Sequence, residues 1–175
     1  MTFARHTQRL VLAGLLCLAT SAIASEPAHA GSGRPADVRW EELRPFVFGE
    51  ADDDVVIFTT PSCPYCRRLM DHVPTLAKRY RVMVLPISFA SHDAQRVRAL
   101  ACAIDQESAA GTLLLHQDIL LPQEQPCDLT PVAARYQEAS RRGVAAVPFV
   151  IRPDGKTTQG LRPDLEAWLA RGISP

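Results

Sequence analysis

Two cysteines separated by two residues are the part of the sequence best suited to chemistry. Cys63 and Cys66 enclose Pro64 and Tyr65, and they follow an apolar run that ends at Thr59. A thiol in the first turn of a helix lies beside unpaired backbone N–H groups and the positive end of the helix dipole, which favour the thiolate. The pattern predicts a helix from about Cys63, with Cys63 as the attacking thiolate and Cys66 as the resolving thiol.

Two inert roles are open to the same pair, a structural disulfide and half of a zinc site. A zinc site needs a second close pair of ligands, and Cys102 and Cys127 are far apart in the sequence. The histidines after residue 30 also lack the spacing of metal ligands, so no metal or nucleotide cofactor is expected. The four cysteines after residue 30 permit three pairings, and the short spacing of Cys63 and Cys66 favours that pair and leaves Cys102 with Cys127.

The beginning of the chain has the composition of a secretory signal peptide over residues 1–30. A basic start precedes an apolar run that is too short to span a membrane, and small residues allow cleavage after Ala24 or Ala30. Four cysteines in the exported part are consistent with disulfide chemistry. A polar leader at 31–44 is expected to precede one catalytic domain at 45–175.

Composition supports one folded domain and argues against a nucleic-acid partner. The 175 residues include 19 basic and 19 acidic side chains, and 47% of them are apolar. A chain of this length and apolar content buries a core. It has no excess of positive charge to displace counterions from a nucleic acid.

Hydrophobic patterning places the cysteine pair between a strand and a helix of an α/β domain. Buried or short strands are predicted at 46–48, 55–59, 82–87, 148–151 and 157–159. Helices are predicted from about 63 to 77, with a kink at Pro74, and then at 93–115, 130–142 and 163–170. This order predicts a central mixed sheet flanked by helices, with a helical insertion at about 91–142 before the final hairpin.

A second motif, Val147-Pro148, precedes the predicted final hairpin. With the cysteine motif after a buried strand, it makes residues 45–172 resemble the thioredoxin superfamily, and within it the periplasmic DsbC/DsbG family of thiol:disulfide interchange proteins. The resemblance lies in the segments 58–66, 101–103, 127–128, 143–149 and 160–163. It implies a thioredoxin-like fold, a substrate-binding cis-proline loop at Val147 and Pro148, and a structural disulfide between Cys102 and Cys127.

Three departures from that family qualify the resemblance. The stretch before residue 45 is too short for the family's dimerisation domain, so a monomer is expected that favours simple exchange over isomerisation. Val147 replaces the threonine of DsbC and DsbG and resembles DsbA instead. Ile57 occupies the place of a buried acid, so no internal base for Cys66 is apparent, and its proton is expected to pass to solvent or substrate.

The sequence therefore predicts a periplasmic thiol:disulfide oxidoreductase with no cofactor, whose redox direction stays open. Exported proteins with thiols or disulfides are the expected substrates, and a membrane protein is the expected redox partner. Two alternatives remain: a peptide-binding chaperone whose cysteine pair is not essential, and a dedicated assembly factor of a secretion or conjugation apparatus, since short relatives occur in conjugative systems.

Overall fold

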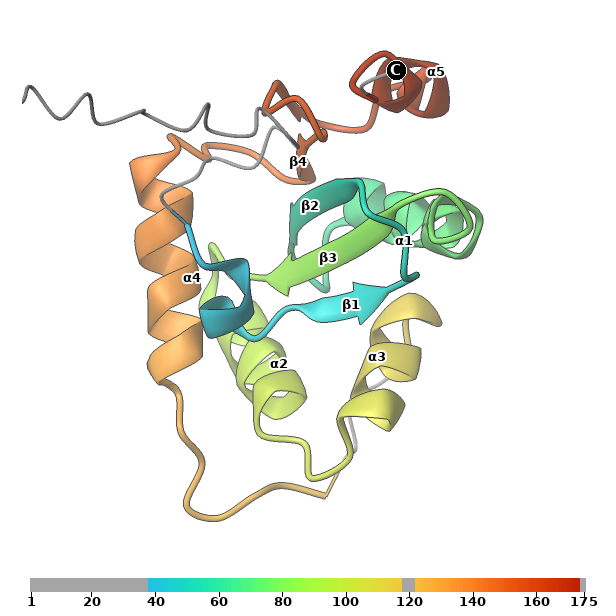
Figure 1. Ribbon diagram of the computed structural model, residues 1–175. Coiled ribbons are helices and arrows are strands. Elements are labelled where there is room, and N and C mark those ends of the chain that lie inside the picture. The colour runs from blue at the N-terminus through green and yellow to red at the C-terminus, as the bar shows by residue number, and fades with distance from the viewer. Residues whose placement is uncertain (1–37, 118–121, 174–175) are drawn as a thin grey trace, which may run out of the picture.

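The computed structural model describes residues 38–117 and 122–173 (Figure 1). The predicted signal peptide and residues 31–37 of the predicted leader lie outside these residues. The elements are η1 (Trp40–Leu43), β1 (Phe46–Phe48), β2 (Asp54–Thr59), α1 (Pro64–Leu76), β3 (Arg81–Pro86), α2 (Ser91–Ala101), α3 (Gln106–Leu114), α4 (Thr130–Arg141), β4 (Phe149–Ile151), β5 (Thr157–Gln159) and α5 (Leu165–Ala170). Within the described ranges, no helix has the length and apolar character needed to cross a membrane.

The sheet has the strand order β1-β3-β2-β4-β5 and is mixed. β2 and β3 run parallel, whereas the β1–β3, β2–β4 and β4–β5 pairs are antiparallel. β2 is central and all six of its residues are buried, which explains its nearly continuous apolar sequence. The structure confirms the predicted α/β fold, with a mixed sheet flanked by helices and a helical insertion before the final hairpin.

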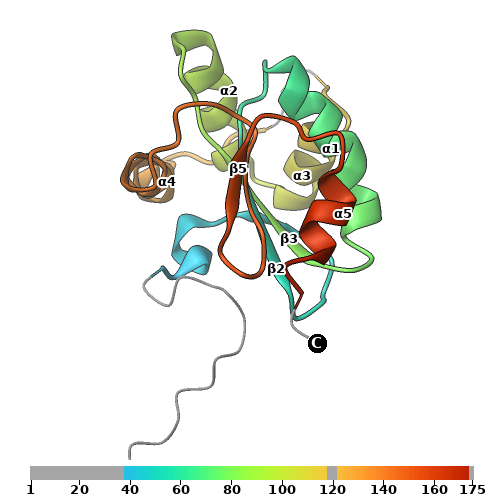
Figure 2. The same ribbon diagram turned by 90° about the horizontal axis from the view of Figure 1, so that it is seen from above.

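Alternate residues of β2 face two separate cores. Val55 and Ile57 pack with the apolar sides of α1, α3 and α5, whereas Val56 and Phe58 pack with η1 and α4. This alternation follows from the two-residue period of a strand. Figure 2 shows the result from above, with α4 on one side of the sheet and α1 and α5 on the other.

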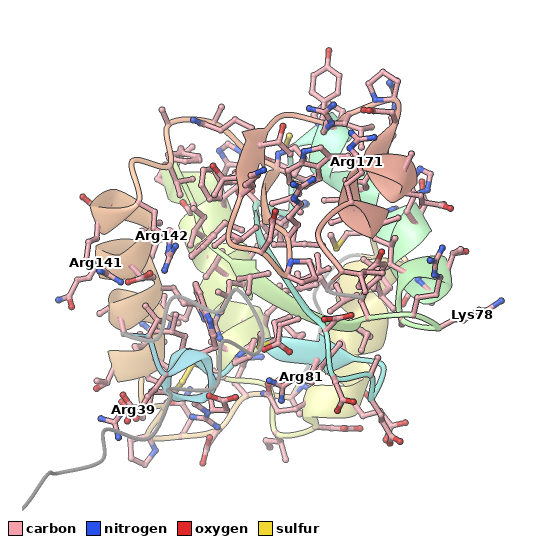
Figure 3. All side chains as sticks on the ribbon, turned by 45° about the horizontal axis from the view of Figure 1, so that its top comes forward. Arg39, Lys78, Arg81, Arg141, Arg142 and Arg171 are labelled. Atoms are coloured by element: carbon pink, nitrogen blue, oxygen red, sulfur yellow. A yellow bond between two sulfur atoms is a disulfide. The ribbon has the colours of Figure 1, made fainter. Side chains whose placement is uncertain are left out.

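Residues before the predicted domain boundary at 45 belong to the second core. Trp40 is fully buried and meets Phe58 edge to face, with ring centroids 6.4 Å apart. Arg142, labelled in Figure 3 at the end of α4, places its guanidinium 4.9 Å from the Trp40 ring centroid. Leu43 is also buried. The folded unit therefore starts before residue 45, because η1 packs between the sheet and α4.

The insertion departs from the sequence prediction, because the single helix predicted at 93–115 is two helices, α2 and α3. The Asp105 side chain accepts hydrogen bonds from the backbone N–H groups of Glu107 and Ser108 and so begins α3 anew. Cys102, directly after α2, forms a disulfide with Cys127, and their Cα atoms are 5.5 Å apart. Pro74 lies in the last turn of α1, which continues to Leu76.

Candidate active site

The cysteine motif lies where β2 leads into α1. Cys63 has extended backbone angles and is the N-cap residue of α1, and Pro64 opens the helix. The Cys63 sulfur accepts a hydrogen bond from the backbone N–H of Cys66 at 3.4 Å. A helix N-terminus thus presents an unpaired N–H to this sulfur, an arrangement that stabilises negative charge there.

The proline loop lies directly against Cys63. The Cys63 thiol donates to the backbone carbonyl oxygen of Val147 at 3.7 Å, although the two residues are 84 positions apart in the sequence. The Val147–Pro148 peptide bond is cis. Gln159 of β5 holds the loop from behind, because its amide oxygen accepts from the backbone N–H groups of residues 145–146 at 3.2 and 2.9 Å. The fold therefore brings the two predicted motifs together.

Cys66 lies below this surface and is 1% exposed. Burial raises the pKa of its thiol to about 12, and hydrogen bonds with the Thr59 side chain and the Thr60 backbone offset only part of that rise. Both cysteines are free thiols here, and Cys63 is partly accessible. The neighbouring Tyr65 is 56% exposed. An accessible sulfur above a buried one suits attack by Cys63 and a later, internal reaction by Cys66.

A buried carboxylate fixes the loop just before Cys63. Asp93, in the first turn of α2, is 3% exposed. Its two oxygens accept hydrogen bonds from the backbone N–H of Ser62 at 3.1 Å and from the Ser62 hydroxyl at 2.6 Å. The insertion is therefore anchored to the turn that carries the cysteine motif.

Residues 49–171 match the family model of a thioredoxin-like domain. The chain belongs to this family. The match covers most of the chain and includes the cysteine motif, the insertion and the proline loop. Among curated protein sequences, none matches the chain.

Solved structures show the same thioredoxin-like fold. A disulfide interchange protein from Neisseria gonorrhoeae is 21% identical, with a TM-score of 0.61, over 79% of this chain and 100% of that one. The catalytic domain of Proteus mirabilis ScsC is 19% identical, with a TM-score of 0.54, over 74% and 89% of the two chains. A periplasmic thioredoxin-like protein from Salmonella enterica serovar Typhimurium is 18% identical, with a TM-score of 0.51, over 74% and 91%.

Several polar residues of this thioredoxin-like site were missed by the sequence analysis. Asp93 and Gln159 hold the loops on either side of Cys63, and Thr59 lies beside Cys66. An acid in the first turn of a predicted helix is a signal for Asp93, but it indicates only a helix start. Nothing in the sequence pairs it with Ser62, because the two residues belong to different elements.

The burial difference in this thioredoxin-like pair predicts selective alkylation. Reduced protein treated with iodoacetamide at pH 8 should gain one adduct, at Cys63. With a pKa of about 12, only about one Cys66 thiol in ten thousand is ionised at that pH, and it is also shielded. Peptide mass mapping after short exposure checks this, with unfolded protein as the control in which both cysteines react. Equal labelling of both residues in folded protein would contradict the assigned roles.

Asp93 is expected to contribute measurably to stability. Replacing Asp93 with alanine removes two hydrogen bonds to a buried carboxylate and should lower the free energy of unfolding by about 2 kcal/mol. Urea titration of the reduced protein measures this. Ser62→Ala is the matched control, because it keeps the backbone bond, and it should cost about 1 kcal/mol. An unchanged midpoint for Asp93→Ala would show that the anchor is not energetically significant.

Proposed function

We propose that this protein is a thiol:disulfide oxidoreductase that exchanges disulfides with exported proteins through Cys63 and Cys66. The observation that carries the proposal is the arrangement around Cys63. Its sulfur lies at a helix N-terminus, 3.4 Å from a backbone nitrogen and 3.7 Å from the Val147 carbonyl oxygen, and the second thiol is buried beneath it. Membership of the thioredoxin-like family supports the same chemistry.

The proposed reaction consists of two thiol–disulfide exchanges. The Cys63 thiolate attacks one sulfur of a substrate disulfide, forms a mixed disulfide, and releases the other substrate sulfur as a thiolate that takes up a proton. The Cys66 thiolate then attacks the Cys63 sulfur, forms the Cys63–Cys66 disulfide, and releases the second substrate thiolate. The substrate gains two electrons and the protein loses two. The reverse sequence oxidises a substrate dithiol.

The loop at Val147 is the proposed place where the substrate backbone binds. Its carbonyl oxygen already contacts Cys63, so a substrate strand that pairs with residue 147 brings its own sulfur to the nucleophile. Pro148 follows on a cis bond and has no N–H, so it presents no competing donor on that face. Pro64 and the exposed Tyr65 are the residues between the two cysteines, and we propose that they contact the substrate beside Cys63.

We infer a periplasmic location and a membrane protein as redox partner from the predicted signal peptide. A Cys102–Cys127 disulfide suits an oxidising compartment. One structural neighbour is described as a periplasmic thioredoxin-like protein. An oxidoreductase that turns over must exchange electrons with a second system, and in an exported setting the membrane supplies one.

Redox titration tests the proposal. The protein is equilibrated in glutathione buffers, quenched with acid and alkylated, and its mass is then measured by mass spectrometry. The fraction oxidised should show one two-electron transition, at Cys63–Cys66. Its potential is expected between about −270 and −120 mV, the range of thioredoxin-like pairs. Cys102–Cys127 serves as an internal control and should stay oxidised throughout. A Cys63–Cys66 pair that does not respond, with no turnover of a disulfide peptide, would instead favour the chaperone or assembly-factor alternative.

A further inference from the structure

A small cavity lies against the buried thiol of Cys66. Its volume is about 20 Å³, which is enough for one water molecule. Its walls come from the end of β2 and the turn after it, from α1 and α2, and from α3 and the turn that follows it. They include Thr59, Thr60, Cys66, Arg67, Arg96 and His116. The cavity therefore joins the resolving cysteine to polar groups of the insertion.

One wall of the cavity carries an unsatisfied hydroxyl. Thr60 is 6% exposed, and its Oγ1 has no hydrogen-bond partner among the described residues. Leaving a buried hydroxyl unpaired costs about 1–3 kcal/mol, and buried water is the usual partner of such groups. A water molecule in the cavity would satisfy Thr60 and would lie next to the Cys66 sulfur and the Thr59 hydroxyl, which already interact.

His116 lies on the same cavity and is oriented by a carboxylate. Its Nε2 is 3.0 Å from Oδ1 of Asp71 on α1. A carboxylate only accepts hydrogen bonds, so in the neutral imidazole this contact places the proton on Nε2 and the lone pair on Nδ1. The side chain of His116 is 21% exposed and that of Asp71 is 65% exposed, so this pair also contacts solvent.

We propose that His116, oriented by Asp71, accepts the proton of Cys66 through a water molecule in this cavity and passes it to solvent. The Cys66 S–H proton moves to the water as a water proton moves to Nδ1, which leaves a thiolate and an imidazolium. The inference rests on the proposed function, because it concerns the second exchange. The high pKa that burial gives Cys66 explains why this step needs a base. Arg67 and Arg96 also line the cavity.

Reaction of reduced protein with excess DTNB, an aromatic disulfide reagent, separates the two steps. Cys63 displaces the first thionitrobenzoate, and Cys66 displaces the second by closing the Cys63–Cys66 disulfide. Thionitrobenzoate leaves as an anion and needs no proton. In the second step the proton of Cys66 is therefore the only one that must move. In His116→Asn the first phase should be unchanged and the second about tenfold slower or more. Asparagine suits position 116, where φ is +56°.

The pH profile and chemical rescue distinguish a base from a merely structural residue. The wild-type second phase should slow on acidification, because an imidazole accepts a proton only when it is neutral. In His116→Asn the rate should instead follow the thiolate fraction of Cys66, which rises about tenfold per pH unit at every pH below its pKa of about 12. Asp71, Arg67, Arg96 and Cys66 are the other titratable or charged groups around His116 that bear on the profile. In His116→Gly, added imidazole should restore the second phase.

A matched control is His72→Asn, which removes a histidine of α1 that also lies close to a carboxylate. His72 Nδ1 is 3.8 Å from Glu166 Oε1 and lies outside the cavity walls, so both phases should be unchanged. An unaltered second phase in His116→Asn, or no rescue by imidazole, would overturn the role of His116 and leave the proposed function intact. Absence of the first phase in the wild-type protein would instead contradict the proposed function.

Discussion

Cys63→Ser is expected to lose disulfide exchange by more than about 1,000-fold, because it removes the only accessible sulfur of the pair and a serine hydroxyl is not ionised near neutral pH. The loss should appear in kcat, since the Val147 loop that holds the substrate is unchanged. The initial rate of exchange with a disulfide-containing peptide measures it. Circular dichroism and thermal melting should match the wild-type protein, because Cys63 lies at the partly accessible end of α1.

Cys66→Ser is the matched variant, with a different expected outcome. The first attack by Cys63 should proceed, and the reaction should stop at a mixed disulfide because no resolving thiol remains. Mass spectrometry should find one substrate molecule attached to Cys63, released by a reductant. A Cys63→Ser protein with more than a few per cent of wild-type exchange, or a Cys66→Ser protein that traps nothing, would contradict the assigned order of attack.

The Cys102→Ser/Cys127→Ser double variant is expected to lose about 3.5 kcal/mol of stability. The two residues are 25 positions apart, and the chain-entropy estimate for a loop of that length gives this value. The disulfide joins the end of α2 to the segment before α4, so its removal leaves these two parts of the insertion without a covalent link. Guanidinium titration of wild-type and double-variant proteins measures the difference.

Exchange activity should survive in this double variant under conditions where it is folded. Asp93 still anchors the start of α2 to Ser62, so the turn before Cys63 keeps its support. Wild-type protein in a reductant strong enough to open the disulfide is the control and should lose similar stability. Equal stability of the two proteins would show that the disulfide does not constrain the unfolded chain. Loss of exchange activity in the folded double variant would show that the Cys102–Cys127 disulfide positions the active site.

The sequence predicts the sheet and the position of the cysteine motif well, because both depend on local patterns. The run Val55–Phe58 is apolar on both faces, as a central strand requires, and Pro64 is typical of a first helical turn. These signals act over a few residues. They suffice to place Cys63 at a helix N-terminus, where the structure has it.

The polar environment of the site could not be predicted in the same way. The pairs Asp93–Ser62 and His116–Asp71 join residues 31 and 45 positions apart, and side-chain periodicity carries no information on such partners. Helical periodicity also continues across residues 102–105, so it concealed the break between α2 and α3 that Asp105 and the disulfide impose. The leader predicted at 31–44 includes Trp40, a large aromatic of the kind found in cores, and the structure buries it.

The pairing of cysteines also bears on how the chain matures. Among the four cysteines that the structure describes, the reactive pair comes first and the disulfide joins the next two in order, so the loops they close neither overlap nor interleave. A chain oxidised as it emerges N-terminus first meets each native partner before any later cysteine appears. Oxidation in the order of synthesis would therefore form the native bonds directly, without a reshuffling step catalysed by an isomerase.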